Sequence, residues 1–217
     1  MEAQVTAVAN KIEYWNVNIP VEEHTVDCPD FLLDCPPHEV TVLSTPEDEF
    51  VFTTWNDVTD ALEGKRALFF GRRPTVLRRY CKYMYDKWEQ YGSYTAPLMA
   101  QLGWESLKPI SKHPFLCPSD YKIAVNDFPY GFGPEFCHLT VWSKSPLPND
   151  ESGFMKYSTE DLVDEFVKRT FAKHRGRRIW WANPQQRRSV EAIDHFHVLL
   201  DNPAPGYVAA LTRCSEA

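Results

Sequence analysis

The sequence predicts an α+β domain with a mainly antiparallel sheet, packed helices and an extended N-terminal arm. Three observations predict this fold. Short runs of β-branched and aromatic residues gather after residue 120, amphipathic helical patterns stand before and among them, and the two kinds do not alternate as in a parallel α/β sheet. The 217 residues, 43% of them hydrophobic, are enough for one domain with a hydrophobic core.

The first fifty residues differ from the rest in their proline content and acidic turns. They predict an arm over residues 1–50 that packs on a single catalytic domain at 51–217. Residues 1–10 lack the basic and apolar regions of a signal peptide, and no run reaches membrane-spanning length. We therefore expect a cytoplasmic protein without membrane contacts.

Two helices are predicted before the strands. Residues 74–91 begin with a proline, carry apolar side chains at steps of three and four, and end at Gly92. A short helix over 95–102, interrupted near Pro97, should follow.

Strands and helices then mix along the rest of the chain. Residues 121–126 and 138–143 are predicted strands joined by a polar turn, and 159–174 is a helix that stops before Gly176. The patterns that follow predict a strand at 178–182, a helix at 185–193 and a strand at 195–200.

The six cysteines have irregular spacing and form no Cys-x-x-Cys pair. This argues against a zinc ribbon and, in a reducing compartment, against disulfides. We expect free thiols, mostly in the core, and no metal.

Basic residues are concentrated in two segments although the net charge is -7. Segments 65–90 and 168–188 hold sixteen of the twenty-three basic residues, whereas residues 1–64 hold fourteen acidic side chains and one lysine. The segments are either solvated helix faces matched by acidic loops or, if they share a face, a patch for a phosphate backbone.

His195-Phe-His197 places two imidazoles on one face of a predicted strand, because strand side chains alternate with period two. Such a pair is suited to a metal, a phosphate or ester, or acid–base catalysis, and it is also typical of two inert, hydrogen-bonded histidines. Asp194 beside the pair and His138 on another strand favour a site. Nucleotide-binding glycine motifs and a Gly-x-Ser-x-Gly elbow are absent from the sequence, so no cofactor is expected.

Carboxylates gather in two other places. Asp127 and Glu135 flank the turn that contains Tyr130, where they either cap the backbone or face a ligand. The helix at 159–174 carries four more, which either favour the helix dipole or recognise a guanidinium or amine; these are Glu160, Asp161, Asp164 and Glu165. Trp142 is either core or a binding platform.

Seven segments, in order over nearly the whole chain, resemble the fungal N-acetylglucosamine-induced protein family. Phe128 stands where that family is expected to have tryptophan. The segments are Asn18-Ile-Pro20, Cys28-Pro-Asp-Phe-Leu32, Asp120-Tyr-Lys-Ile123, Asn126-Asp-Phe-Pro-Tyr-Gly131, His138-Leu-Thr-Val-Trp142, Glu165-Phe-Val-Lys-Arg-Thr-Phe171, and Ser189-Val with His195-Phe-His-Val198.

The resemblance implies a function, because members from fungal biosynthetic clusters are arginine-containing cyclodipeptide synthases. Such an enzyme joins arginine from arginyl-tRNA to the residue of a second aminoacyl-tRNA as a diketopiperazine. His138, His195 and His197 would then act in acid–base catalysis and oxyanion stabilisation, assisted by Asp127 and Glu135. The substrates would contact Tyr130, Trp142, Glu160, Asp161, Asp164, Glu165 and Asp194. The tRNA would contact Arg72, Arg73, Arg78, Arg79, Lys82, Lys173, Arg175, Arg177, Arg178, Arg187 and Arg188.

Two other functions remain open. The histidine pattern is faintly similar to histidine-triad nucleotide hydrolases, which would act here on nucleotides or aminoacyl-adenylates, but Leu199 occupies the third histidine position. A non-catalytic, N-acetylglucosamine-induced RNA-binding protein would use the basic segments alone.

Overall fold

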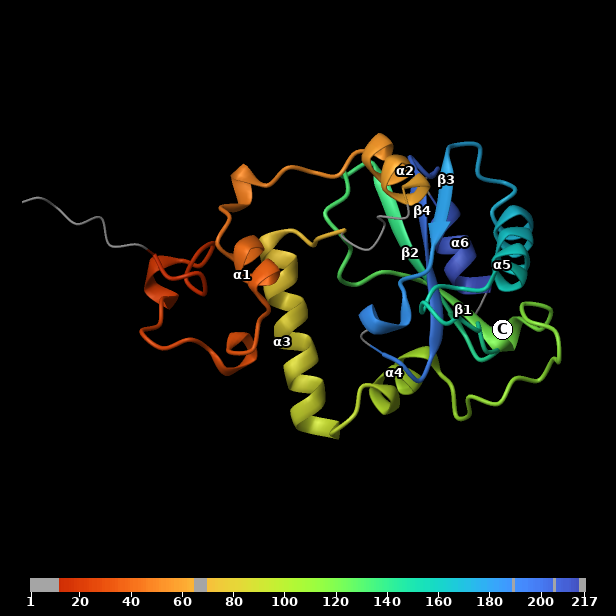
Figure 1. The fold of residues 1–217 in the computed structure, drawn as a ribbon, viewed down its shortest axis with the longest axis horizontal. Coiled ribbons are helices and arrows are strands. Elements are labelled where there is room, and N and C mark those ends of the chain that lie inside the picture. The colour runs from red at the N-terminus through yellow and green to blue at the C-terminus, as the bar shows by residue number, and fades with distance from the viewer. Residues whose placement is uncertain (1–11, 65–69, 189, 205, 215–217) are drawn as a thin grey trace, which may run out of the picture.

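The computed structural model describes residues 12–64, 70–188, 190–204 and 206–214. Its centre is a four-stranded sheet in the order β1-β2-β4-β3, in which each neighbouring pair is antiparallel (Figure 1). The strands are β1 (Tyr121–Val125), β2 (Phe136–Ser143), β3 (Arg178–Trp181) and β4 (Asp194–Asp201). The expected α+β fold with an antiparallel sheet is confirmed.

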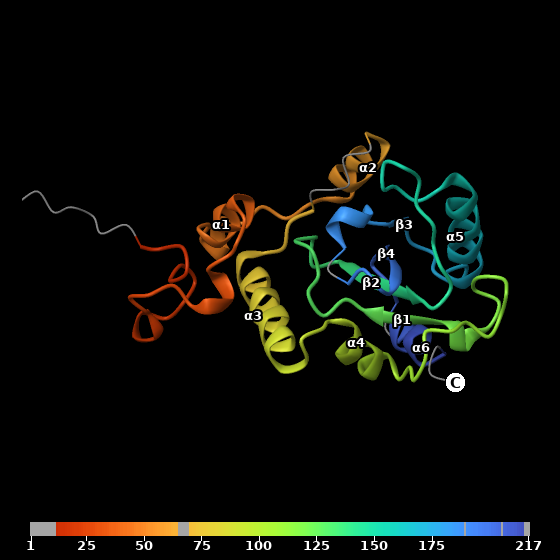
Figure 2. The same cartoon turned by 60° about the horizontal axis from the view of Figure 1, so that its bottom comes forward.

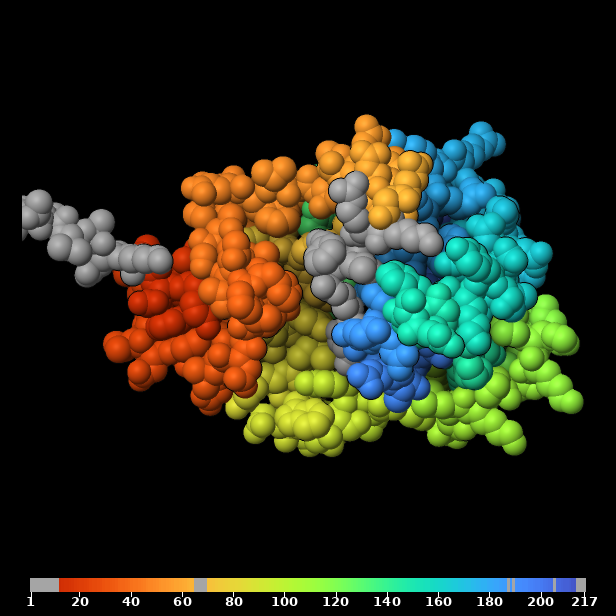
Figure 3. Space-filling model, in the orientation of Figure 1, coloured from red at the N-terminus to blue at the C-terminus, as the bar shows by residue number. Residues whose placement is uncertain are grey.

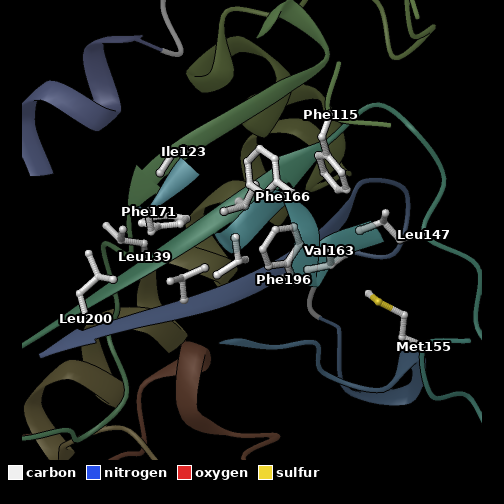
Figure 4. Close-up of a cluster of buried hydrophobic side chains, with 13 residues drawn as sticks. Phe115, Ile123, Leu139, Leu147, Met155, Val163, Phe166, Phe171, Phe196 and Leu200 are labelled. Atoms are coloured by element: carbon white, nitrogen blue, oxygen red, sulfur yellow. The ribbon is translucent and has the colours of Figure 1, made fainter. Parts of the chain in front are cut away.

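One face of the sheet is covered by α5 (Tyr157–Thr170) and α6 (Tyr207–Cys214). Strand side chains alternate in direction, so Leu139 of β2 and Phe196 of β4 both point to this face. They meet Val163 and Phe166 of α5 in a cluster of buried side chains (Figure 4). This cluster is the main core of the protein.

The opposite face is covered by α2 (Trp55–Glu63), α3 (Pro74–Tyr91) and α4 (Thr95–Leu102). Figure 2 shows α3 and α5 on opposite sides of the sheet. A capping box of Thr54 and Asp57 begins α2, and Gly92 in the left-handed conformation ends α3. The alternate strand side chains therefore face a layer in which polar and aromatic groups are enclosed.

Residues 12–50 pack against α3. They contain α1 (Pro37–Leu43) and three short 3-10 turns, Val21–Glu23, Asp30–Leu32 and Glu47–Glu49. Leu32, Leu43 and Leu77 of α3 form a separate buried cluster. In Figure 3 this segment, red to orange, forms a lobe at one end of the molecule. It is a short helical lobe and not the extended arm expected from its prolines, because Pro37 occupies the first turn of α1, where a missing N–H costs nothing.

The remaining elements agree unevenly with the sequence predictions. Helix α3 has the predicted bounds, and α4 is not interrupted, because Pro97 lies in its first turn. The predicted helix at 185–193 is wrong: only a 3-10 turn over Gln185–Arg187 forms, and Arg188 is extended, with φ -84° and ψ 121°. The sequence analysis missed α1, α2 and α6.

Among the described residues, no helix combines the length and the apolar character that crossing a bilayer requires.

Candidate functional site

Three imidazoles meet on the sheet face opposite α5. His138 comes from β2, and His195 and His197 come from β4, where the register places His197 across from Thr140. His138 Nε2 lies 3.1 Å from His197 Nδ1. All three side chains are buried, with exposed fractions of 3%, 7% and 5%. The structure thus brings together the three histidines that the sequence singled out.

The backbone fixes the proton positions of two of these rings. The N–H of Tyr130 donates to His138 Nδ1 at 3.3 Å, so Nδ1 is unprotonated and the proton of the neutral ring is on Nε2. His138 Nε2 then donates to His197 Nδ1, which leaves the His197 proton on Nε2. This chain of contacts makes His197 Nε2 a hydrogen-bond donor.

Asn183, in the loop after β3, lies against this donor. Its side-chain Nδ2 lies 3.3 Å from His197 Nε2 and 2.9 Å from the Tyr130 hydroxyl, to which it donates. With the His197 proton on Nε2, the amide turned by 180° would instead direct its oxygen toward both groups, because the nitrogen and oxygen of an amide differ little in shape. Asn183 therefore orients His197 and Tyr130 together.

His195 has the opposite arrangement. Its Nδ1 lies 3.2 Å from the carbonyl oxygen of Ile193, which can only accept, so the ring proton is on Nδ1. The lone pair is left on Nε2, and the ring packs against Trp142 with centroids 4.5 Å apart. One strand thus presents an acceptor imidazole and a donor imidazole two residues apart.

Burial keeps these rings neutral. It lowers the pKa of His138 to about 3 and that of His195 to about 4, and it holds the pKa of His197 well below the ordinary 6.5. The positive charge of Arg72 lowers the pKa of His138 and His197 further. At neutral pH the acceptor on His195 is therefore available.

A cleft of about 460 Å³ opens above His195 and His197. Its walls come from α3, α4, β1 and the segment Asn126–Phe128. The Arg72 guanidinium lies over the Tyr80 ring at 3.8 Å from the centroid, and its Nε donates to the Phe128 carbonyl at 3.1 Å. The volume suits a small-molecule substrate, and a guanidinium and two neutral imidazoles line it.

Several candidate residues line this cleft and others do not. Asp127, Tyr130 and Trp142 line it, and Asp127 accepts a hydrogen bond from Gln101 Nε2 at 3.0 Å. Glu135 is exposed just before β2, where its carbonyl accepts from the Asn202 N–H. Its assignment to the catalytic group is corrected, because it lies at the far end of the strand from the cleft.

The carboxylates of α5 are also corrected as substrate contacts. Glu160, Asp161, Asp164 and Glu165 belong to the helix that packs on the other face of the sheet. Asp164 forms an ion pair with Lys168 and accepts a hydrogen bond from Trp180 Nε1. These groups cannot reach the cleft.

Asp194 and Arg188 form a buried ion pair instead of contacting substrate or tRNA. Arg188 Nη1 donates to Asp194 Oδ1, and Asp194 Oδ2 accepts from the Leu147 N–H at 3.0 Å. Arg188 is only 8% exposed. The pair joins the loop before β4 to the segment after β2, so both assignments are corrected to a structural role.

The other basic candidates separate into two groups. Arg79 and Lys82 are exposed on α3, and Lys173 and Arg175 are exposed beyond the end of α5. Several of the rest have internal partners: Arg73 pairs with Glu47, Arg78 donates to the Trp15 carbonyl, Arg177 pairs with Asp201, and Arg178 is half-buried on β3; the Arg187 side chain lies outside the described residues. The exposed candidates thus lie in two places, on α3 and beyond the end of α5.

Sequence reasoning missed Asn183 and Gln101. Neither belongs to a charged or histidine-rich motif, and each becomes a site residue only through the packing of its loop or helix on the cleft. The pair Asn183-Pro184 directly after a strand could have predicted a turn near the site. It could not have predicted that Asn183 contacts His197.

Comparison with known proteins places the chain in a family. Residues 54–201 match the family described as "Protein of unknown function (DUF3605)". N-acetylglucosamine-induced protein 1 of Candida albicans is 32% identical over 100 residues, 43% of this chain and 39% of that protein. The uncharacterized protein YPL067C of Saccharomyces cerevisiae is 29% identical over 144 residues, 59% of this chain and 72% of that one.

The crystal structure of HTC1 shares the fold, with a TM-score of 0.58 and 23% identity, covering 75% of this chain and 92% of that one. The match to Candida albicans N-acetylglucosamine-induced protein 1 supports the resemblance to that fungal family. Since the family match covers more than half of the sequence, the chain belongs to the DUF3605 family of proteins of unknown function.

Proposed function

We propose that this protein is an aminoacyltransferase that makes an arginine-containing cyclodipeptide in fungal secondary metabolism. It would join arginine from arginyl-tRNA to the residue of a second aminoacyl-tRNA and release a diketopiperazine. The observation that carries the proposal is the pairing of an acceptor imidazole, His195, with a donor imidazole, His197, at the base of one cleft. Aminolysis of an ester requires both roles at once.

The chemistry assigns one step to each ring. As the amine of one aminoacyl group attacks the ester carbonyl of the other, His195 Nε2 takes the amine proton. His197 Nε2–H would turn from the Asn183 oxygen to the developing oxyanion, while His138 holds the ring in place. The carbon–oxygen ester bond then breaks, and the tRNA ribose oxygen leaves with the proton. A second aminolysis of the same kind closes the ring and frees the second tRNA.

The charges around the cleft are consistent with these substrates. Asp127 is the carboxylate of the cleft wall, and it would receive a guanidinium. Arg72, Lys87 and Lys122 line the same cleft, and the exposed Arg79 lies over the ring of Phe128, which also lines it. These cations would meet the terminal phosphates of an acceptor arm.

Mass spectrometry of cultures expressing the protein in a host with its own charged tRNA tests the proposal. We expect a cyclic dipeptide that contains arginine, and purified protein should form it from aminoacylated tRNA only until RNase is added. The variants H195A and H197A should lose the product while keeping their circular dichroism spectra. H113A, which alters an exposed histidine, is the matched control. Product that survives RNase treatment, or full activity in both site variants, would refute the proposal.

A histidine-triad-like hydrolase is the second candidate, favoured by one observation. His138 lies directly across from Leu199 in the β2–β4 register, so a neighbouring strand supplies an imidazole beside the position that lacks one. Such an enzyme would cleave adenosine phosphoramidates or aminoacyl-adenylates and form no dipeptide. A binding protein would do neither and would keep salt-sensitive RNA affinity.

A further inference from the structure

Two thiols and a carboxylate meet far from the cleft floor, where the N-terminal lobe packs on α3. Cys35 precedes α1, Glu39 lies in the first turn of α1, and Cys81 lies in the middle of α3. One ligand atom from each of these residues lies within 4.8 Å of the others. Three segments thus converge on one point with sulfur and oxygen donors.

The donors are held close although they repel one another when charged. Cys81 Sγ lies 4.0 Å from Glu39 Oε2. All three side chains are half-buried, so an ion from solvent can reach them. Two sulfur atoms and a carboxylate oxygen this close together are an arrangement that a divalent cation would stabilise.

We propose that Cys35, Glu39 and Cys81 bind a zinc ion. Tetrahedral zinc with bonds to sulfur of about 2.3 Å places two sulfur ligands roughly 3.8 Å apart, so the three donors need only a small movement to reach coordination. Water would complete the fourth position. Binding would displace the remaining thiol protons to solvent, because zinc is coordinated by the thiolate form.

A nearby arginine favours a metal site with a net negative charge. Two thiolates, a carboxylate and Zn²⁺ carry a net charge of -1, and the guanidinium of Arg78 lies close enough to Cys81 to interact with its charge. Arg78 is held there by donating to the Trp15 carbonyl at 2.7 Å. A neighbouring guanidinium would offset the excess negative charge.

The position of the site gives the metal a structural role. Tyr80, Tyr83 and Lys87 of α3 line the cleft, while Cys81 of the same helix faces the N-terminal lobe. A zinc ion between α1 and α3 would therefore fix the lobe against the helix that forms one cleft wall. It would contact no reacting group of the proposed transfer, and the inference does not depend on that function.

Zinc content and cobalt substitution of the full chain test this inference. Protein purified with a phosphine reductant and reconstituted with zinc should hold about one equivalent, and Co²⁺ should give thiolate charge-transfer bands in the near ultraviolet. C35S and C81S should lose at least ~10-fold in metal affinity, and E39Q should lose ~10-fold or more. C28S is the matched control, because the Cys28 thiol lies 3.3 Å from the Tyr14 hydroxyl and does not belong to the three-ligand cluster.

Hydrogen exchange on the wild type provides a second measurement that needs no folded variant. Removal of zinc by a chelator should speed exchange in residues 12–50 and in α3, and zinc should restore protection. The inference is overturned if the reconstituted protein holds less than ~0.1 equivalent of zinc, or if C35S and C81S bind Co²⁺ as the wild type does. A Cys35–Cys81 disulfide in protein isolated without reductant, together with no zinc uptake after reduction, would also overturn it.

Discussion

His195 and His197 lie two residues apart on one strand, yet their backbone partners give them opposite hydrogen-bonding roles. A carbonyl holds the proton of His195 on Nδ1, whereas an N–H acting through His138 holds the proton of His197 on Nε2. The same side chain thus becomes an acceptor or a donor according to its neighbours.

Asn183 should matter for activity although it carries no charge. In N183L, His197 Nε2 and the Tyr130 hydroxyl lose their shared partner, and an unsatisfied buried polar group costs about 1–3 kcal/mol. We expect a fall of about 5- to 150-fold in kcat for the proposed transfer, measured by product formation, with a smaller change in KM. N183D keeps an acceptor oxygen and should retain more activity than N183L. Equal activity in N183L and wild type would contradict the orienting role.

The buried histidines should make the fold sensitive to mild acid. Their pKa values are lowered in the folded chain, so between pH 6.5 and about 4 the unfolded chain binds protons that the folded chain does not. The free energy of unfolding should therefore be constant above pH 7 and fall as the pH is lowered through this window. Each histidine contributes up to about 1.4 kcal/mol per pH unit.

Urea unfolding of the wild type and of H138Q at pH 5 to 7 measures this effect. The dependence of the free energy of unfolding on pH should be weaker in H138Q than in the wild type, because the proton taken up by His138 on unfolding is absent. An unchanged slope in H138Q would show that His138 is not held neutral by burial.

The histidines could be predicted from the sequence because strand periodicity is local. His-x-His on a strand must share a face, and His138 belongs to a neighbouring apolar run. Asn183 and Arg72 could not be predicted in their roles, since the loop after β3 and the segment that leads into α3 reach the cleft only through long-range packing.

The secondary structure elements also divide into those that the local sequence encodes and those that tertiary contacts decide. Helix α3 was predicted with its observed bounds, because proline, an apolar stripe and glycine encode it locally. Residues 185–193 also have a helical pattern, but Arg188 is extended and forms an ion pair with Asp194, so that of this pattern the described residues form only the 3-10 turn Gln185–Arg187. A tertiary contact thus overrode the local preference. The predicted pattern contained no sign of that contact.

Gly131, in the loop before β2, should be required for the packing of this loop against the segment between α1 and α2. Its N–H donates to the Gly71 carbonyl and its carbonyl accepts from the Thr53 N–H, both at 2.8 Å. A Cβ at this position would collide with the ring of Phe50. G131A should therefore lower the free energy of unfolding by about 1–3 kcal/mol in urea titrations.

G71A is the matched control, because a Cβ there meets nothing within 4 Å, and it should change stability by less than about 0.5 kcal/mol. G131A should also lower activity, since Tyr130 next to it holds the His138 tautomer. If the two variants are equally stable, the packing of Phe50 does not constrain this loop.

Over the whole molecule, the sheet separates the apolar core from the cleft, and it also separates the cations at the cleft from those beyond the end of α5. The face with α5 holds the apolar core, and the face with α3 and α4 holds the cleft (Figure 2). Lys87 of α3 lines the cleft and Arg79 lies over the ring of Phe128 at its wall, whereas Lys82 turns toward Phe31 of the N-terminal segment. The exposed cations beyond α5 follow a helix that packs on the other face of the sheet. Under the proposed function, Arg79 and Lys87 would therefore meet a tRNA whose aminoacyl end enters the cleft.

Charge reversal on each side should therefore separate the two groups. The double variant R79E/K87E should weaken tRNA binding about 10-fold or more at physiological salt and reduce the salt dependence of binding by about one unit per lost phosphate contact. K173E/R175E alters two exposed cations beyond the end of α5 and should leave both quantities near their wild-type values. Filter binding at several salt concentrations measures affinity and slope together. Equal losses in the two variants would mean that tRNA is held by the overall field of the protein and not by the α3 face, and the aminoacyl end would then have no fixed route into the cleft.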